Sequence, residues 1–271
     1  MPELPEVETT VRGITPHIKG HPITDVIVRD SRLRWPVPEV LAQRVIGETV
    51  RSVRRRAKYI LIELAQGHVM VHLGMSGSLR LSSPGEPPSP HDHVEFEIDG
   101  GYRLRLRDPR RFGSVLWVEG EPDEHPLLIH LGIEPLSQEL VGSYLYSASR
   151  RRKAAVKNFI MDSRIVVGVG NIYASEALYR AGIDPRRAAG RISLLRYDSL
   201  SSSIQQTLRD AIAAGGTTLR DFVDGSGSPG YFRHDLEVYD REGKPCFRCG
   251  REIARRVIGQ RSTYFCRRCQ K

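Results

Sequence analysis

The first residues after the initiator methionine, Pro2 and Glu3, combine a potential nucleophile with a carboxyl group. Removal of Met1 would leave the secondary amine of Pro2 as the N-terminus. An α-amino group titrates near about pH 8, so far more of it is unprotonated at neutral pH than of a lysine. An unprotonated amine can form a Schiff base, and the neighbouring carboxyl can exchange protons. Taken alone, these residues are better explained as an ordinary helix start.

Four cysteines near the C-terminus have the spacing of a metal site. Two C-x2-C pairs are separated by sixteen residues: Cys246 with Cys249, and Cys266 with Cys269. Two such knuckles present four thiolates, which complete a tetrahedral zinc site and leave no position for a substrate. The spacing therefore predicts one structural zinc ion. Disulfides are the alternative, and they are rare in intracellular proteins.

The net charge of +9 is concentrated in the same segment. Residues 241–271 contain ten Lys or Arg against two Glu, a net +8, which leaves +1 for the first 240 residues. A basic segment interleaved with Phe247, Tyr264 and Phe265 indicates a nucleic-acid partner rather than a membrane surface. No apolar run approaches the roughly 18 residues that cross a bilayer, and no secretory signal is evident. We expect a cytoplasmic protein that is associated with the nucleoid.

The elements that must position these groups change in type along the chain. Val7, Val11, Ile14 and Ile18 recur at near-helical spacing, and Pro5 suits the first turn of that helix. Short β-branched segments then predict strands: Ile23–Arg29, Val50–Leu64, Val69–Leu73, Ser78–Leu81, Val94–Ile98, Tyr102–Arg107 and Ser114–Val118. Helical patterns follow at Ala154–Met161, Ile172–Ala181 and from Ser193 onward. The order predicts an α+β protein with a leading helix, an N-terminal domain that is an antiparallel β-sandwich or a barrel, and a C-terminal helical domain.

The segment Gly168-Val169-Gly170-Asn171 precedes one of the predicted helices. It is not a dinucleotide-binding motif, because the third glycine of G-x-G-x-x-G would fall on Tyr173 and no parallel βαβ pattern surrounds it. A tight turn that opens a helix instead offers backbone N–H groups to a phosphate. The turn is equally well described as a simple helix–turn–helix corner, and the two interpretations are compatible with each other.

Six segments in this order resemble the bacterial formamidopyrimidine-DNA glycosylases. They are Pro2–Glu8, Ala57-Lys58-Tyr59, His72–Gly77, Asp108–Gly113, Gly168–Ala174 and the terminal cysteine module. The resemblance implies an enzyme that removes 8-oxoguanine and ring-opened purines from duplex DNA and then nicks the abasic site. It also implies a helix-two-turn-helix motif, a β-hairpin zinc finger, a monomeric protein and no cofactor in the chemistry.

The resemblance implies roles for four catalytic residues. Pro2 would attack C1′ of the damaged nucleotide, and Glu3 would donate the proton that opens the sugar ring. Lys58 would contact phosphate and assist elimination. Arg261 would contact phosphate from the zinc finger and take part in δ-elimination.

The resemblance also implies a set of DNA contacts. Met75, Arg110 and Phe112 would fill the space left by the flipped nucleotide, and the donors of Arg110 suit the acceptors of an orphaned cytosine. Met75 and Phe112 taken alone could be core residues. The backbone contacts would be His91, Lys153 and Asn171, with Lys157 near the lesion. The glycine-rich stretch Thr217–Tyr231 would close over the flipped base.

The predicted domains are a catalytic sandwich at 1–120, a connecting segment at 121–150, a helical DNA-binding domain at 151–235 and the zinc-finger hairpin at 236–271. Two alternatives remain open at this level. One is a related glycosylase for oxidised pyrimidines, although the Leu4–Glu8 continuation favours the purine branch. The other is a non-catalytic zinc-finger protein that binds duplex DNA.

Overall fold

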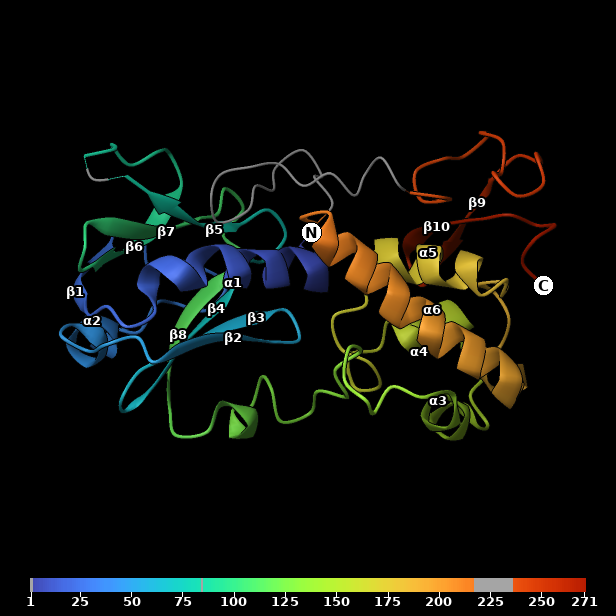
Figure 1. Cartoon of the computed structure of the whole chain (residues 1–271), viewed down its shortest axis with the longest axis horizontal. Helices are drawn as coiled ribbons and strands as arrows, with labels where there is room; N and C mark the ends of the chain where they lie inside the picture. The colour runs from blue at the N-terminus through green and yellow to red at the C-terminus, as the bar shows by residue number, and fades with distance from the viewer. Residues whose placement is uncertain (1, 84, 217–235) are drawn as a thin grey trace. The chain divides into compact units, whose positions relative to one another are not determined.

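The computed structural model describes residues 2–83, 85–216 and 236–271, and it divides into two compact units. The first unit is Met1–Ile129 with the start of the segment that begins at Ala214. The second unit is His130–Ala213 with the C-terminal residues from position 234. The first is built mainly of strands and the second mainly of helices (Figure 1). The predicted α+β class is confirmed, and the predicted domain boundaries stay predictions.

Two antiparallel sheets of four strands form the described part of the first unit. One sheet has the order β1 (Ile23–Val28), β6 (Asp92–Ile98), β7 (Tyr102–Arg107) and β5 (Ser78–Ser82). The other has the order β2 (Ser52–Arg56), β3 (Tyr59–Glu63), β4 (Gly67–His72) and β8 (Ser114–Glu119). Helix α1 (Leu4–Ile18) packs against β2, β3 and β5. The short helices α2 (Val40–Val45) and η1 (Pro122–Glu124) complete the unit.

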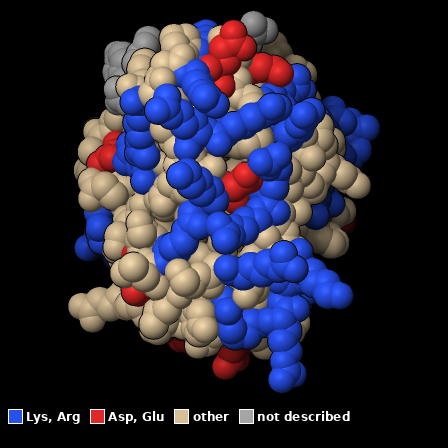
Figure 2. Space-filling model, turned by 90° about the vertical axis from the view of Figure 1, so that its right-hand side faces the viewer, with Lys and Arg blue, Asp and Glu red and all other residues tan. Residues whose placement is uncertain are grey.

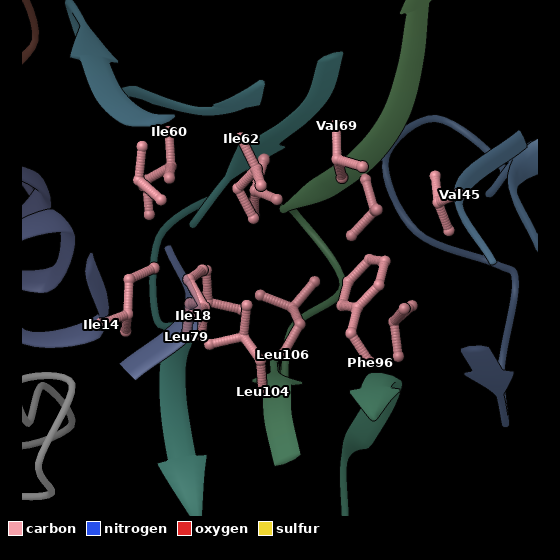
Figure 3. Close-up of a cluster of buried hydrophobic side chains, with 14 of the residues drawn as sticks. Ile14, Ile18, Val45, Ile60, Ile62, Val69, Leu79, Phe96, Leu104 and Leu106 are labelled. Atoms are coloured by element: carbon pink, nitrogen blue, oxygen red, sulfur yellow. The ribbon is translucent and has the colours of Figure 1, made fainter. Parts of the chain in front are cut away.

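The core of the first unit lies between the two sheets, and α1 contributes to it (Figure 3). Ile60, Ile62 and Val69 come from one sheet, and Phe96 and Leu106 from the other. The predicted apolar face of α1 is confirmed, because four of its members are buried in the same cluster: Val7, Val11, Ile14 and Ile18. Burial of a side chain of this size stabilises a protein by roughly 1.5–3 kcal/mol. The core therefore fixes the orientation of α1 against the sandwich.

The strand predicted at Val50–Leu64 is wrong in one respect, because the chain reverses within it. Strands β2 and β3 pair from Arg56 opposite Tyr59 outward, so only Ala57 and Lys58 form the turn. Ala57 has a φ of 54°, the left-handed conformation that a two-residue hairpin turn requires. The sequence contains no glycine or asparagine at this turn to indicate it.

The alternation predicted for Tyr102–Arg107 is confirmed, with Leu104 and Leu106 in the core. Arg105, on the opposite face of the sheet, is nevertheless fully buried. Its guanidinium forms an ion pair with the buried Glu95 and donates to the carbonyls of Glu86 and Pro87. The loop after β5 therefore covers this face of the sheet.

The second unit contains α3 (Gly142–Ser149), α4 (Val156–Ile160), η2 (Ala189–Arg191), α5 (Asn171–Arg180) and α6 (Leu194–Ala213), and a hairpin of β9 (Ala254–Ile258) and β10 (Arg261–Phe265). Helix α6 packs against α3 and α5. Within α5, Glu176 is fully buried and accepts the N–H groups of Glu237, Val238 and Tyr239. This carboxylate therefore joins α5 to the segment that leads to the cysteines. No helix in the described ranges is long and apolar enough to span a membrane.

His72, at the end of β4, is a neutral hydrogen-bond acceptor inside the first unit. Its Nδ1 accepts the Gly74 N–H at 3.0 Å. Burial is the main cause that lowers the pKa of His72 to about 4, and the charges of Lys58 and Arg34 lower it further. The imidazole therefore stays neutral near pH 7 and holds the start of the turn that carries Met75.

We expect the first unit to lose stability as pH falls below the ordinary histidine pKa of 6.5. The folded state binds fewer protons at His72 than the unfolded state does, so protonation favours unfolding, by up to about 3 kcal/mol as pH approaches 4. Both tryptophans, Trp35 and Trp117, lie in this unit, so tryptophan fluorescence during urea unfolding reports on it alone. His72→Asn keeps an acceptor for Gly74 and should flatten the dependence between about pH 7 and pH 5.

His91→Asn is the matched control, because His91 is exposed. It should leave the pH dependence of the unfolding free energy as in the wild type. Equal slopes for the wild type and His72→Asn would contradict the assignment to His72.

Candidate active site and DNA-binding surface

Pro2 and Glu3 lie directly before α1 and both are buried. The Glu3 N–H donates to Glu6 Oε2 at 2.7 Å, and the two residues form a reciprocal capping box. Pro5 lies in the first turn, as predicted. The capping interactions satisfy N–H groups that a helix start otherwise leaves without partners, and they fix the direction in which the chain enters the helix. The backbone next to the Pro2 nitrogen is therefore held in one orientation.

Lys58 lies in the β2–β3 turn, and Arg55 joins this turn to α1. The Arg55 guanidinium donates to Glu8 Oε2 at 3.0 Å and to the carbonyl of Ala57 at 2.9 Å. Because Glu8 belongs to the second turn of α1, the arginine connects the Lys58 turn to the helix that carries Pro2 and Glu3. The structure thus places three of the predicted catalytic residues in the first unit and shows what joins their elements.

The predicted lesion-capping loop, Thr217–Tyr231, lies outside the described residues. The residue before it, Gly216, has a φ of +84° and lies against Glu6. A Cβ at Gly216 would be 3.3 Å from both Cγ and Oε1 of Glu6. Gly216 is therefore in contact with the capped start of α1.

Met75 and Phe112 are large apolar side chains that the structure leaves exposed. Their exposed fractions are 40% and 43%, so neither is a core residue. Arg110 is also exposed, and its guanidinium carbon lies 4.9 Å from the centre of the Phe112 ring. The loops that carry them touch, because a Cβ on Gly74 would be 2.5 Å from the Gly113 nitrogen. The structure thus gathers an exposed apolar pair and an arginine on two adjoining loops.

His91 is exposed and has a φ of 74°, and its carbonyl accepts the Asp108 N–H at 3.0 Å. It is therefore joined to the loop that carries Arg110 and Phe112. In the second unit, Lys153 is exposed in the segment before α4. These two positions leave a cationic or polar side chain accessible to a partner.

Asn171 and Lys157 join α5 to the hairpin. Lys157 is 0% exposed, and its ammonium donates to Asn171 Oδ1 and, at 2.7 Å, to Thr263 Oγ1. Asn171 Nδ2 donates to the carbonyl of Ser262 at 3.0 Å. These bonds fix β10 at the residues that follow Arg261. The observed role of Lys157 is therefore internal, and its predicted place near the lesion stays a prediction.

Arg261 is exposed at the start of β10. The turn before it approaches α4 closely, because a Cβ on Gly259 would lie 2.6 Å from the amide atoms of Asn158. Gly259 also has a positive φ of 56°. The hairpin turn is thus held by α4 on one side while the Arg261 side chain stays accessible.

The four cysteines form one cluster, with all Sγ atoms within 4.8 Å of one another. The Sγ atoms of Cys246 and Cys269 are 3.9 Å apart, and those of Cys249 and Cys266 are 3.5 Å apart. A tetrahedral zinc ion with Zn–S bonds of about 2.3 Å requires sulfur atoms about 3.8 Å apart, so the cluster fits. The Tyr179 hydroxyl and Cys246 Sγ also form a hydrogen bond, at 3.1 Å. The four cysteines therefore lie close enough together to bind one zinc ion, as predicted.

Basic side chains predominate over acidic ones on one face of the molecule (Figure 2). Aromatic rings support several of the arginines in the second unit. Arg241 lies 3.5 Å from the centre of the Phe247 ring, and Arg248 lies 4.2 Å from that of Tyr179. Phe247 is exposed, whereas Tyr179 is buried. The basic face matches the polyanionic partner predicted from composition.

Glu6, Arg55 and Asp108 were not identified as site residues by sequence reasoning. Glu6 had a usable signal, because an acidic residue three positions after Glu3 is the spacing of a capping box. Arg55 and Asp108 make contacts to residues distant in the chain or in irregular loops. Their partners could not be read from spacing.

Comparison with known families matches three consecutive segments of the chain. Residues 1–115 match the formamidopyrimidine-DNA glycosylase N-terminal domain, and residues 131–223 match the formamidopyrimidine-DNA glycosylase H2TH domain. Residues 243–271 match the zinc finger found in FPG and IleRS. The order agrees with that of the sandwich, the helical region and the cysteine hairpin.

Individual relatives match over the whole chain. The formamidopyrimidine-DNA glycosylase of Syntrophotalea carbinolica is 59% identical over 100% of both chains. The Lactococcus lactis Fpg (MutM), solved with N7-benzyl-Fapy-dG DNA, has a TM-score of 0.91 and 30% identity over 100% of both chains. A MutM solved with carbocyclic 8-oxo-G DNA has a TM-score of 0.90 at the same identity and coverage. The chain therefore belongs to the formamidopyrimidine-DNA glycosylase family.

Proposed function

We propose that this protein is a base-excision repair DNA glycosylase that removes oxidised purines from duplex DNA and then nicks the abasic site. The observation that carries the proposal is the Pro2–Glu3 pair, buried at a capped helix start in a chain of this family. The substrates would be 8-oxoguanine and formamidopyrimidines, in keeping with the lesions in the DNA bound to the related structures. We further propose that the protein is a monomer that works on this DNA in the cytoplasm, at the nucleoid.

The chemistry begins once Met1 has been removed and the Pro2 amine is free. The positive end of α1 disfavours protonation of that amine. The amine attacks C1′ as the bond to the damaged base breaks, and Glu3 gives a proton to the sugar-ring oxygen as the ring opens. The resulting Schiff base acidifies the neighbouring carbon, so the 3′ and then the 5′ phosphate leave by β- and δ-elimination. Lys58 and Arg261 would hold these phosphates and assist the eliminations.

Reaction at C1′ requires the nucleotide to leave the base stack, because the target atom is inaccessible inside a duplex. Met75 and Phe112 would enter the space it leaves, and apolar wedges of this kind stabilise an unstacked, kinked duplex. Arg110 would donate to O2 and N3 of the orphaned cytosine. Exposure of the two apolar side chains supports this use, because such exposure is unfavourable in the free protein.

A zinc ion at the four cysteines would have a structural role and would take no part in the reaction. Its four thiolate ligands would join the two knuckles and so support the hairpin that carries Arg261. His91, Lys153 and Asn171 would contact the DNA backbone. Lys157, which is buried, would act on the lesion side only through Asn171 and the hairpin.

We expect borohydride to trap a covalent adduct between the wild-type protein and a duplex that contains 8-oxoguanine opposite cytosine. Reduction converts the Schiff base to a stable amine, so the adduct reports on the covalent step. Pro2→Gly should reduce the trapped fraction by more than about tenfold, because the secondary amine is lost. Pro5→Ala, in the first turn of α1, should trap as the wild type does. Equal trapping by Pro2→Gly would show that the secondary amine of Pro2 is not required, and a wild type that binds without trapping would indicate a non-catalytic DNA-binding protein.

We also expect loss of one cysteine to release the zinc ion and to abolish tight binding to duplex DNA. Cys249→Ser removes a thiolate, whereas Phe247→Ser changes an exposed neighbour in the same knuckle and should keep its zinc. Metal content by atomic spectrometry and DNA affinity by fluorescence anisotropy measure the two effects. Unchanged binding by a zinc-free Cys249→Ser protein would contradict a structural role for the metal.

A further inference from the structure

We infer that Asp108 is a positioning residue that holds the Met75 loop and the Arg110–Phe112 loop in one arrangement, and so sets which base is accepted opposite the lesion. The inference rests on the proposed function and concerns a residue that contacts no DNA itself. Asp108 is 0% exposed and follows the last residue of β7. It therefore cannot act except through its neighbours.

The Asp108 carboxylate bonds to both loops at once. Its Oδ2 accepts the Gly113 N–H at 2.7 Å, directly after Phe112. Its Oδ1 accepts the Ser76 hydroxyl at 3.4 Å, directly after Met75. One buried side chain thus links the residues adjacent to the two exposed apolar side chains.

The Asp108 backbone extends the same set of contacts. Its carbonyl accepts the Arg111 N–H at 3.1 Å and contacts His93 Nε2 at 2.8 Å. Its N–H donates to the carbonyl of His91, a predicted DNA contact. The positions on both sides of Arg110 are therefore fixed by a single residue.

The two loops pack closely against each other at their glycines. A Cβ on Gly74 would lie 2.5 Å from the Gly113 nitrogen, and a Cβ on Gly113 would lie 2.6 Å from the carbonyl oxygen of His72. The Gly113 carbonyl also accepts the Arg34 N–H at 3.0 Å. Because the loops meet backbone to backbone, a shift of one displaces the other.

The side-chain chemistry at position 108 predicts a graded series of variants. A carboxylate offers only acceptors, which suits the Gly113 N–H and the Ser76 hydroxyl together. Asparagine keeps one oxygen for Gly113, and its amide can donate to the Ser76 oxygen, since a hydroxyl also accepts. Alanine leaves a buried N–H without its acceptor, which is unfavourable. Geometry rather than charge should therefore decide the outcome.

The experiment compares Asp108→Ala, Asp108→Asn and the wild type on duplexes with 8-oxoguanine opposite cytosine or adenine. For Asp108→Ala we expect kcat/KM opposite cytosine to fall by about tenfold to a hundredfold, and the preference for cytosine over adenine to be largely lost. Asp108→Asn should recover most of both. Borohydride trapping on a preformed abasic site, which needs no base flipping against an orphaned base, should change by less than about twofold.

Asp30→Ala is the matched control, because Asp30 contacts the same loop from the surface through an ion pair with Arg111 at 2.9 Å. A surface ion pair contributes little to stability, so its loss should leave the loop in place and the base preference as in the wild type. Hydrogen exchange of the free protein gives an independent reading. In Asp108→Ala, peptides that cover 73–77 and 108–113 should exchange faster, while those from β3 and β4 should not change.

A retained preference for cytosine in Asp108→Ala, or unchanged exchange in both loops, would overturn the inference. If Asp108→Ala does not fold, Ser76→Ala carries the test, because it removes only the bond to Oδ1. Exchange across 73–77 must then rise, and no change would equally overturn the inference. A wild type without trapping would refute the proposed function, whereas the exchange measurement would still decide whether Asp108 joins the loops.

Discussion

The hydrogen bond from the Glu3 backbone to the Glu6 carboxylate is the constraint on which the proposed chemistry depends. A chain terminus is ordinarily among the most mobile parts of a protein. Here the terminus is connected directly to a capped helix whose apolar face is buried in the sandwich core. The position of the Pro2 amine is therefore fixed by the packing of α1 against the core. A reactive group that must meet one sugar carbon needs such positioning, because small misplacements greatly slow a reaction.

The first unit uses the same principle at two further points. Arg55 connects the Lys58 turn to α1 through Glu8, and Asp108 connects the loops that carry Met75 and Phe112. In each case the hydrogen bonds of one charged side chain connect two elements that no backbone hydrogen bonds of a helix or sheet connect. The exposed groups that would touch DNA are thus held by residues that would not. The second unit repeats the arrangement with Lys157, whose buried ammonium joins α5 to the hairpin beside Arg261.

The spacing of residues along the sequence predicted the features that depend on residues close together in the chain. The cysteine pairs specified the zinc cluster, and the periodicity of Val7, Val11, Ile14 and Ile18 specified the buried face of α1. The hairpin at Ala57-Lys58 was missed because its turn uses an alanine in a left-handed conformation, which only the surrounding strand pairing makes acceptable. The burial of Arg105 was missed because it depends on Glu95 and on a covering loop. The site residues of the motifs came from resemblance, whereas the residues that hold them became apparent only in three dimensions.

The most direct measurement of the central claim is mass spectrometry of the borohydride-trapped complex after nuclease and trypsin digestion. The account predicts that the sugar remnant is attached to the nitrogen of Pro2, in the peptide that ends at Arg12, with no methionine before it. A remnant attached to Lys58 or to another lysine would contradict it. So would an adduct on a chain that keeps Met1, because the Pro2 nitrogen would then be an amide and could not attack.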